Sequence, residues 1–366
     1  MSSWIKSHNN NRKRHILTPN IQLQSIPLEK LKVYYITNVL VGGSFKYIQD
    51  LILSFPTISF IPITNIGELQ KYSREFNSNH ILLLQYLILS NISITNIIEI
   101  VTRTNIKLVI PIHDFYYFSP STNDSTIEIH NSYLKSNVIP SEKLHLFNLA
   151  KHIIFPSNFV KNEYLKYFNI SNYIVSSHID YEVHPKIYIP PIKNKTINIA
   201  LINELTECKG IEYYKELLKI TNYNTYNINY HIFTGDKVFA NYPNTYIHPR
   251  YKNEQIILLL YENNIHSILF LNKWGETYCY SLTHALQSSI PLLYSNIGAF
   301  TERIPNLEHY FPVNPDPTTK YCSLNSISDS FFKMLEYIIE KNGLFTFNPD
   351  NNIIKIPDFY NRLFGI

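Results

Sequence analysis

Short apolar runs alternate with amphipathic stretches along the chain from Leu31 onwards. The runs have the length of β-strands, and several are rich in β-branched residues, as buried parallel strands usually are. In the first half of the chain, strands are predicted over 33–37, 59–62, 81–84, 107–112, 152–155 and 173–175. Between them, apolar residues recur at three- and four-residue spacing, which predicts helices over 45–53, 94–104 and 158–167.

A proline-bearing stretch at 183–195 interrupts this rhythm and is interpreted as a linker. A second series follows, with strands over 197–202, 228–233, 267–271 and 291–295 and helices over 211–220, 253–261 and 280–288. A last helical pattern covers 327–341. Repeated alternation of strand and helix predicts an α/β fold of two doubly wound, Rossmann-like domains that face each other across a cleft.

The expected boundaries follow from these patterns and from a length of 366 residues, roughly twice that of a usual domain. We expect an N-terminal arm over 1–30, a first Rossmann-like domain over 31–190 and a second over 191–340. The final segment, 341–366, is expected to be a C-terminal segment that packs back on the first domain.

Charge and cysteine content narrow the functional classes. A net charge of +4 without a continuous basic stripe argues against a nucleic-acid partner. The cluster from Arg12 to His15 is interpreted as part of a solvated arm, with a contact to a membrane surface or an acidic partner as the alternative. Three cysteines without metal-ligand spacing fit a reducing compartment, and the polar N-terminus is unlike a signal peptide. We therefore expect a soluble, cytoplasmic protein.

Glycine is scarce, with nine residues in the chain, and most of them follow predicted strands. These are positions where the backbone approaches a ligand or adopts a positive φ, although ordinary turns explain any single one. The glycines in such positions are Gly42, Gly43, Gly210, Gly235, Gly275 and Gly298. Gly42 and Gly43 also precede a predicted helix, where their N–H groups could face a phosphate.

The segment from Trp274 to Leu286 carries the strongest signal. It follows the strand predicted over 267–271 and leads into a helix, so the N–H groups of Thr277, Tyr278, Cys279 and Tyr280 would lie at the positive end of the helix dipole. Such a place suits a diphosphate. Glu276 could accept hydrogen bonds from sugar hydroxyls or, alternatively, serve as the N-cap of the helix.

The run from Gly275 to Leu286, followed by Ile290-Pro291-Leu292-Leu293 and by Gly298 to Arg303, resembles the donor-site signature of retaining glycosyltransferases of family 4, which have the GT-B fold. It is most similar to the branch of O-antigen and cell-surface polysaccharide enzymes. Shorter motifs agree in order and spacing: Gly42-Gly43, Ile112 to Phe115, Phe155 to Val160, Lys209-Gly210, His231 to Gly235 and Pro249 to Tyr251. The resemblance covers about 31–303.

The resemblance implies roles for particular residues. Lys209 would lie against the donor diphosphate, Glu276 would contact the donor sugar, and His113 would face the transferred sugar from the first domain. These three are the predicted catalytic residues. The donor-binding residues implied by the resemblance and by the glycine pattern are Gly42, Gly43, Lys209, Gly235, Arg250, Tyr251, Glu276, Thr277, Tyr278, Cys279, Tyr280 and His284.

Two positions depart from the family pattern. The second motif glutamate, which contacts the nucleotide ribose, is replaced by His284, and the phosphate-binding arginine of many relatives is replaced by Glu204. A neutral histidine still offers one hydrogen bond to a hydroxyl. His284 therefore leaves two interpretations open, a changed nucleotide contact or lost activity.

The resemblance thus implies transfer of a hexosyl or deoxyhexosyl group from a nucleotide diphosphate sugar to a glycan or other hydroxyl acceptor, with retention of configuration. No metal and no other cofactor is expected, since no Asp-x-Asp element occurs. The donor would be held in the second domain and the acceptor in the first. The alternative is an inactive GT-B protein that acts as a binding or scaffolding partner in glycan synthesis. A phosphorylase or epimerase is a weaker third reading.

Overall fold

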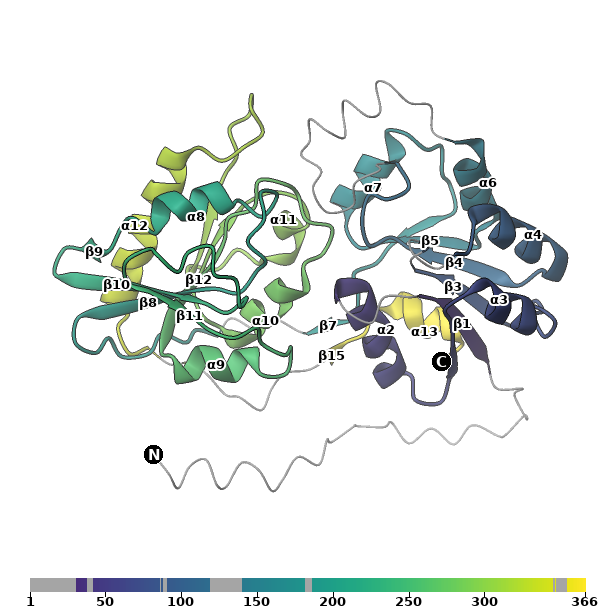
Figure 1. Ribbon diagram of the computed structural model, residues 1–366, viewed down its shortest axis with the longest axis horizontal. Coiled ribbons are helices and arrows are strands. Elements are labelled where there is room, and N and C mark those ends of the chain that lie inside the picture. The colour runs from purple at the N-terminus through teal and green to yellow at the C-terminus, as the bar shows by residue number, and fades with distance from the viewer. Residues whose placement is uncertain are drawn as a thin grey trace, which may run out of the picture. The chain divides into compact units, whose positions relative to one another are not determined.

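The computed structural model describes residues 31–37, 42–85, 87, 91–118, 140–181, 186–344, 346 and 354–366. Two sheets of parallel strands form its framework, each with helices on both faces (Figure 1). The predicted arm over 1–30, including the basic cluster from Arg12 to His15, lies outside the described residues, as does 183–185 of the predicted linker.

The first sheet has six parallel strands in the order β2-β1-β3-β4-β5-β6. Its strands are β1 (Lys32–Ile36), β2 (Ser59–Ile63), β3 (Ile81–Leu84), β4 (Lys107–Pro111), β5 (His152–Phe155) and β6 (Tyr173–Val175). Neighbouring residues along β1 contribute to opposite faces, because Val33 and Tyr34 are both fully buried but in different apolar clusters. Both faces of this sheet are therefore covered, as the apolar runs predict.

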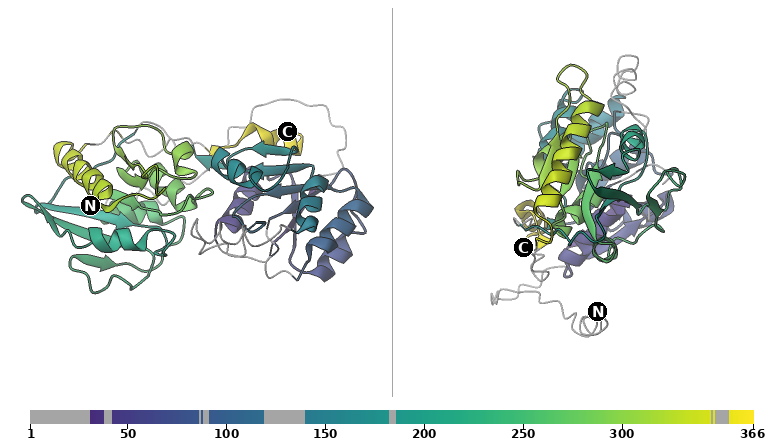
Figure 2. Two further views of the ribbon diagram at one scale, coloured as in Figure 1. Left: turned by 90° about the horizontal axis from the view of Figure 1, so that it is seen from above. Right: turned by 90° about the vertical axis from the view of Figure 1, so that its left-hand side faces the viewer.

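Two groups of helices cover the first sheet. One face packs against α3 (Ile66–Tyr72), α4 (Ile94–Thr104), α6 (Ser141–Leu149) and α7 (Asn158–Leu165). The other face packs against α2 (Gly42–Ser54) and the C-terminal helix α13 (Asp358–Phe364). The chain thus returns at its C-terminus to the sheet with which it begins. In Figure 1 the helix α13 lies beside β1, and Figure 2 shows the helix at the C mark on the half of the molecule that holds the first sheet.

The second sheet has the strand order β11-β10-β8-β12-β13-β14, with parallel pairing throughout, and β9 adds an antiparallel pair to β10. Its strands are β8 (Thr196–Leu201), β9 (Asn222–Tyr223), β10 (Tyr226–Ile232), β11 (Thr245–Ile247), β12 (Ile265–Phe270), β13 (Leu292–Ser295) and β14 (Tyr310–Val313). β12 lies between β8 and β13 and is buried along its whole length. The loops that follow these three strands therefore meet at one edge of the sheet.

Helices cover both faces of the second sheet as well. One face packs against α8 (Ile211–Leu217) and α12 (Leu324–Glu340), and the other against α9 (Ile256–Glu262) and α10 (Tyr280–Ser288). A short helix, α11 (Phe300–Arg303), follows β13. A two-stranded antiparallel pair joins β7 (Asp180–Tyr181) to β15 (Ile354–Lys355). The predicted α/β fold with two doubly wound sheets is confirmed.

Candidate functional site

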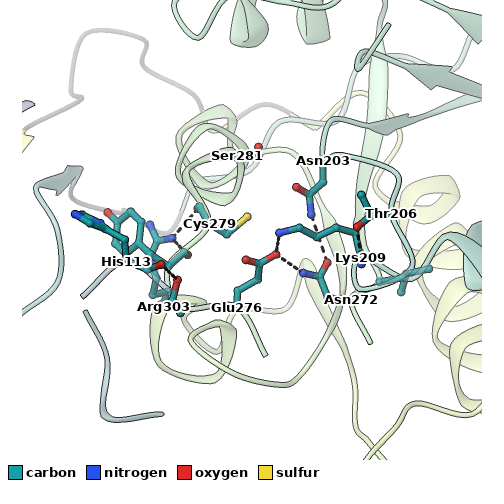
Figure 3. Close-up of polar contacts among 12 residues, drawn as sticks. His113, Asn203, Thr206, Lys209, Asn272, Glu276, Cys279, Ser281 and Arg303 are labelled. Atoms are coloured by element: carbon teal, nitrogen blue, oxygen red, sulfur yellow. Dashed lines mark hydrogen bonds and ion pairs between the residues drawn. The ribbon is translucent and has the colours of Figure 1, made fainter. Parts of the chain in front are cut away.

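The loops after β8 and β12 bring together the two residues that the sequence assigned to the donor. The Lys209 ammonium forms an ion pair and a hydrogen bond with the Glu276 carboxylate (Figure 3). Asn272 Nδ2 donates to the same carboxylate oxygen, Glu276 Oε1, at 2.5 Å, and Asn203 Nδ2 donates to Asn272 Oδ1 at 3.4 Å. A polar chain thus runs from the end of β8, through the end of β12, to Glu276.

The Lys209–Glu276 pair is largely shielded from water, with side-chain exposures of 23% and 14%. Burial lowers the pKa of Lys209, but attraction by the Glu276 carboxylate, with smaller contributions from Cys279 and Glu204, more than offsets this and leaves its pKa above the ordinary value. Lys209 is therefore a fixed cation at neutral pH. A fixed cation in a shielded place interacts strongly with a ligand anion.

Gly210 holds the Lys209 loop against the loop after β12. It has φ +77°, and a Cβ built there would lie 1.7 Å from the Leu271 carbonyl oxygen. Lys273 N donates to Cys208 O at 3.0 Å and joins the same two loops. Only glycine fits this contact, so the sequence places Lys209 beside Glu276 through a local backbone requirement.

The segment before α10 corrects one alternative from the sequence. α10 begins at Tyr280, as predicted, but its N-cap is Cys279 and not Glu276. Thr277 and Tyr278 consequently precede the helix. Cys279 has φ 69° and ψ 93°, a conformation that residues other than glycine rarely adopt. Burial raises the pKa of the Cys279 thiol to about 11, so this thiol stays protonated at neutral pH.

The turn after β13 and the helix α11 contact the segment that leads into α10. Gly298 and Gly275 pack backbone against backbone, since a Cβ on Gly298 would lie 2.5 Å from Gly275 Cα. Ala299 N donates to Glu276 O at 2.9 Å. Arg303 donates to the Tyr278 carbonyl, to the Cys279 carbonyl at 2.9 Å and to Thr283 Oγ1 at 2.7 Å. The backbone around Glu276 is therefore held by several independent contacts.

His113, which follows β4, meets the same segment from the first sheet. Thr277 Oγ1 donates to the His113 carbonyl oxygen at 2.7 Å. Burial lowers the pKa of the His113 imidazole to about 3, so it is neutral at physiological pH. His113 Nε2 is buried and has no hydrogen-bond partner among the described residues. A ligand hydroxyl or water is the kind of group that satisfies such an atom.

An aromatic cluster surrounds His113. The ring of His178 stacks on Tyr278 with centroids 4.3 Å apart and lies 5.1 Å from the His113 ring, while His178 Nδ1 is 3.2 Å from the Tyr280 hydroxyl. A Cβ built on Gly43, in the first turn of α2, would lie 3.3 Å from the Tyr280 ring. Gly43 therefore contacts the predicted donor segment through a side chain of α10. Gly42, where α2 begins, has nothing described within 4 Å of its would-be Cβ.

Gly235, Arg250 and Tyr251 lie together near the ends of β8, β10 and β11. A Cβ on Gly235 would lie 3.0 Å from Arg250 N. The Tyr251 hydroxyl donates to Ile202 O at 2.9 Å and is 3.3 Å from Ser281 Oγ, in the first turn of α10. Tyr251 thus links the end of β8 to the start of α10.

Two other predicted positions differ in exposure. The Arg250 guanidinium pairs with Glu204 at 3.1 Å, and both side chains are exposed. His284, in the second turn of α10, is 7% exposed and lies among the buried residues of the helix. The structure brings Lys209, Glu276, Thr277, Cys279 and Tyr280 into one neighbourhood.

Four residues near the site received no role from the sequence. They are Asn203, Asn272, His178 and Arg303. The asparagines directly follow buried strands, a signal that their position alone could have given. Arg303 and His178 act through contacts between segments distant in sequence, which no local pattern reports.

Within the ranges that the structure describes, no three His, Cys, Asp or Glu side chains gather as a metal site requires. In those ranges no helix has both the length and the apolar character to cross a bilayer.

Comparisons with known proteins support the fold. No protein-family profile matches the chain, and no curated protein matches it significantly. Sucrose-phosphate synthase from Thermosynechococcus elongatus is similar in structure, with a TM-score of 0.57, 12% identity and coverage of 86% of this chain and 92% of that chain. HepE from Anabaena, in complex with UDP and glucose, has a TM-score of 0.53 and 10% identity, with coverage of 85% of this chain and 99% of that chain. The apo form of the lipopolysaccharide outer core galactosyltransferase WaaB has a TM-score of 0.52 and 13% identity, with coverage of 85% of this chain and 99% of that chain.

These similarities extend over most of both chains in each pair, while the identities are low. They therefore concern the arrangement of strands and helices. Together with the two parallel, doubly wound sheets, they show that this chain has the GT-B fold of two Rossmann-like domains.

Proposed function

We propose that the protein is a glycosyltransferase that takes a sugar from a nucleotide diphosphate donor and transfers it, with retention and without a metal, to a glycan or other hydroxyl acceptor. The observation that carries the proposal is the shielded Lys209–Glu276 pair beside the start of α10. It offers a cation for phosphate oxygens and a carboxylate for sugar hydroxyls within one site. The HepE structures that hold UDP, UDP-glucose, or UDP and glucose have the same fold and support a nucleotide-sugar donor.

In this site Lys209 stabilises the charge that grows on the diphosphate as it leaves. The bond between the sugar anomeric carbon and the phosphate oxygen breaks through an oxocarbenium-like state. The acceptor hydroxyl forms the new bond on the same face, and its proton passes to the departing phosphate. The protein then contributes position and electrostatics rather than a dedicated base.

The remaining predicted residues take roles around this centre. Glu276, held by Asn272, accepts hydrogen bonds from the donor sugar hydroxyls. His113 offers a neutral imidazole, and its buried Nε2 suits one hydrogen bond to the transferred sugar. Gly235, Arg250 and Tyr251, which lie near one another, would help to enclose the base, and His284 takes the place of the second motif glutamate.

A nucleotide-sugar panel tests the proposal. The purified full chain is heated with UDP-, GDP- and dTDP-sugars, and release of the nucleoside diphosphate is followed in a separate assay. A true donor raises the melting temperature, because it binds the folded state alone, and is turned over. Turnover by the purified chain also excludes the non-catalytic alternative. If no member of the panel shifts the melting temperature or is consumed, the proposal is wrong.

A further inference from the structure

The guanidinium of Arg303, at the end of α11, lies against the backbone that leads into α10. It donates to the carbonyl oxygens of Tyr278 and Cys279 and to the hydroxyl of Thr283, and its Cζ lies 3.7 Å from the centroid of the Tyr278 ring. Figure 3 shows Arg303 next to Cys279, away from the Lys209 side chain. Arg303 therefore holds the backbone of this segment through several contacts.

The direction of the two carbonyls fixes the direction of two N–H groups. A trans peptide unit points its C=O and its N–H to opposite sides. The Tyr278 carbonyl shares a peptide with the Cys279 N–H, and the Cys279 carbonyl shares one with the Tyr280 N–H. By drawing both carbonyls toward its guanidinium, Arg303 turns both N–H groups away from itself. Over the part of the chain that is described, neither N–H donates a hydrogen bond to the protein.

The backbone at Cys279 needs such support. Its φ of 69° and ψ of 93° are disfavoured for a residue with a Cβ, and such conformations persist only where surrounding contacts impose them. The planar guanidinium carries several N–H donors in a fixed geometry, so that one side chain can hold two adjacent carbonyls and a hydroxyl. A lysine ammonium lacks this planar geometry.

We propose that Arg303 is a positioning residue for diphosphate binding. It holds the peptides on either side of Cys279 so that the N–H groups of Cys279 and Tyr280, at the positive end of the α10 dipole, face the donor phosphates. This inference rests on the proposed function, since it assigns the phosphate contacts of that same site. In this role Arg303 acts through the backbone that it holds.

The test measures how strongly the protein prefers a diphosphate over a monophosphate. UDP and UMP are titrated into wild type, R303M and R303K by calorimetry; if wild type binds GDP or dTDP instead, the corresponding pair is used. R303M is expected to bind UDP about tenfold or more weakly, since hydrogen bonds to charged groups are among the stronger ones, and to lose much of the UDP-over-UMP preference. R303K, which keeps the charge but not the planar geometry, is expected to lie between R303M and wild type.

The control is R74M, which removes an exposed arginine just after α3 on the first sheet and is expected to leave the preference unchanged. The inference is overturned if R303M and R303K keep the wild-type preference for UDP over UMP. It is also overturned if the affinities for UDP and UMP fall by the same factor, as a general structural defect predicts. If R303M fails to fold, R303K alone decides between these results. Wild type that binds none of UDP, GDP and dTDP overturns the proposed function, and with it the role of Arg303.

Discussion

The two sheets share one architecture but present different chemistry where their strands end. The second sheet gathers charged groups, with the cation Lys209, the carboxylate Glu276 and the guanidinium Arg303 around the loops after β8, β12 and β13. The first sheet contributes neutral imidazole rings. His113 and His178 both have a pKa lowered by burial, and they contact the second half through Thr277, Tyr278 and Tyr280.

The two sheets therefore share a fold but differ in the side-chain chemistry at their strand ends. A diphosphate needs fixed positive charge and N–H donors, and the second sheet offers Lys209 near the start of α10 for that purpose. A sugar needs shape and single hydrogen bonds, which neutral rings supply. The following predictions test this division.

The largest expected effect compares equivalent glycines of the two sheets. G210A forces a Cβ to within 1.7 Å of the Leu271 carbonyl oxygen, whereas the new Cβ of G42A has no described atom within 4 Å and brings the strain of a positive φ. We expect G210A to lose more than about 4 kcal/mol of unfolding free energy, or to fail to fold, and G42A to lose about 1–2 kcal/mol. Urea unfolding of both variants measures this. Equal losses would contradict a special backbone requirement beside Lys209.

The next effect separates the sugar contact from the phosphate contact. E276Q removes the carboxylate that we propose accepts from sugar hydroxyls, and it releases Lys209 from its ion pair. We expect kcat/KM for the nucleotide sugar to fall roughly 100-fold, while the affinity for UDP stays the same or improves. E212Q breaks the exposed Lys215–Glu212 pair on α8 and is the matched control. A parallel loss of UDP affinity in E276Q would argue against this division of roles.

Acid should destabilise the protein through its buried histidines. Burial lowers the pKa of His113 to about 3, while the unfolded chain takes up this proton near pH 6.5, so stability is full above pH 6.5 and falls as pH decreases toward 3. Between pH 7 and 5.5 this histidine alone accounts for about 1 kcal/mol. Urea unfolding at both pH values should show a smaller pH-dependent loss in H113N than in wild type. H145N, at an exposed position of α6, should behave as wild type. Equal losses of unfolding free energy in H113N and wild type would show that His113 does not cause the pH dependence.

The smallest expected effect concerns a single contact between the two halves. T277V loses the hydrogen bond from Thr277 Oγ1 to the His113 carbonyl, and T277S keeps it. We expect T277V to lower the unfolding free energy by about 1 kcal/mol and T277S to lower it by less. The urea midpoint of both variants checks this. A T277S midpoint as low as that of T277V would show that the methyl group, rather than the hydroxyl, matters.

Much of the fold was predictable because buried parallel strands give continuous apolar runs. All six strands of the first sheet, and β8, β10, β12 and β13 of the second, fall on predicted runs. The elements missed are short or weakly patterned: β11 has three residues, and the apolar residues of α6 do not form one clear helical face. The domain boundaries at 190 and 340 stay predictions.

The candidate site was predictable only in part. A strand followed by glycine and a helix indicates the neighbourhood of Glu276, and the resemblance added Lys209. Their ion pair joins residues 67 positions apart, so no local pattern shows it. The same holds for Arg303, whose role depends on the carbonyl directions of Tyr278 and Cys279. The roles of all these residues remain proposals.

Titration of UDP into wild type and K209M tests most directly the claim that the second sheet holds the donor diphosphate. K215M, which removes the exposed lysine of the matched pair on α8, is the control. We expect one UDP to bind wild type and K215M alike, and K209M to bind at least about tenfold more weakly, because a charge-assisted contact to phosphate is lost. Equal UDP affinity in K209M and wild type would contradict the account.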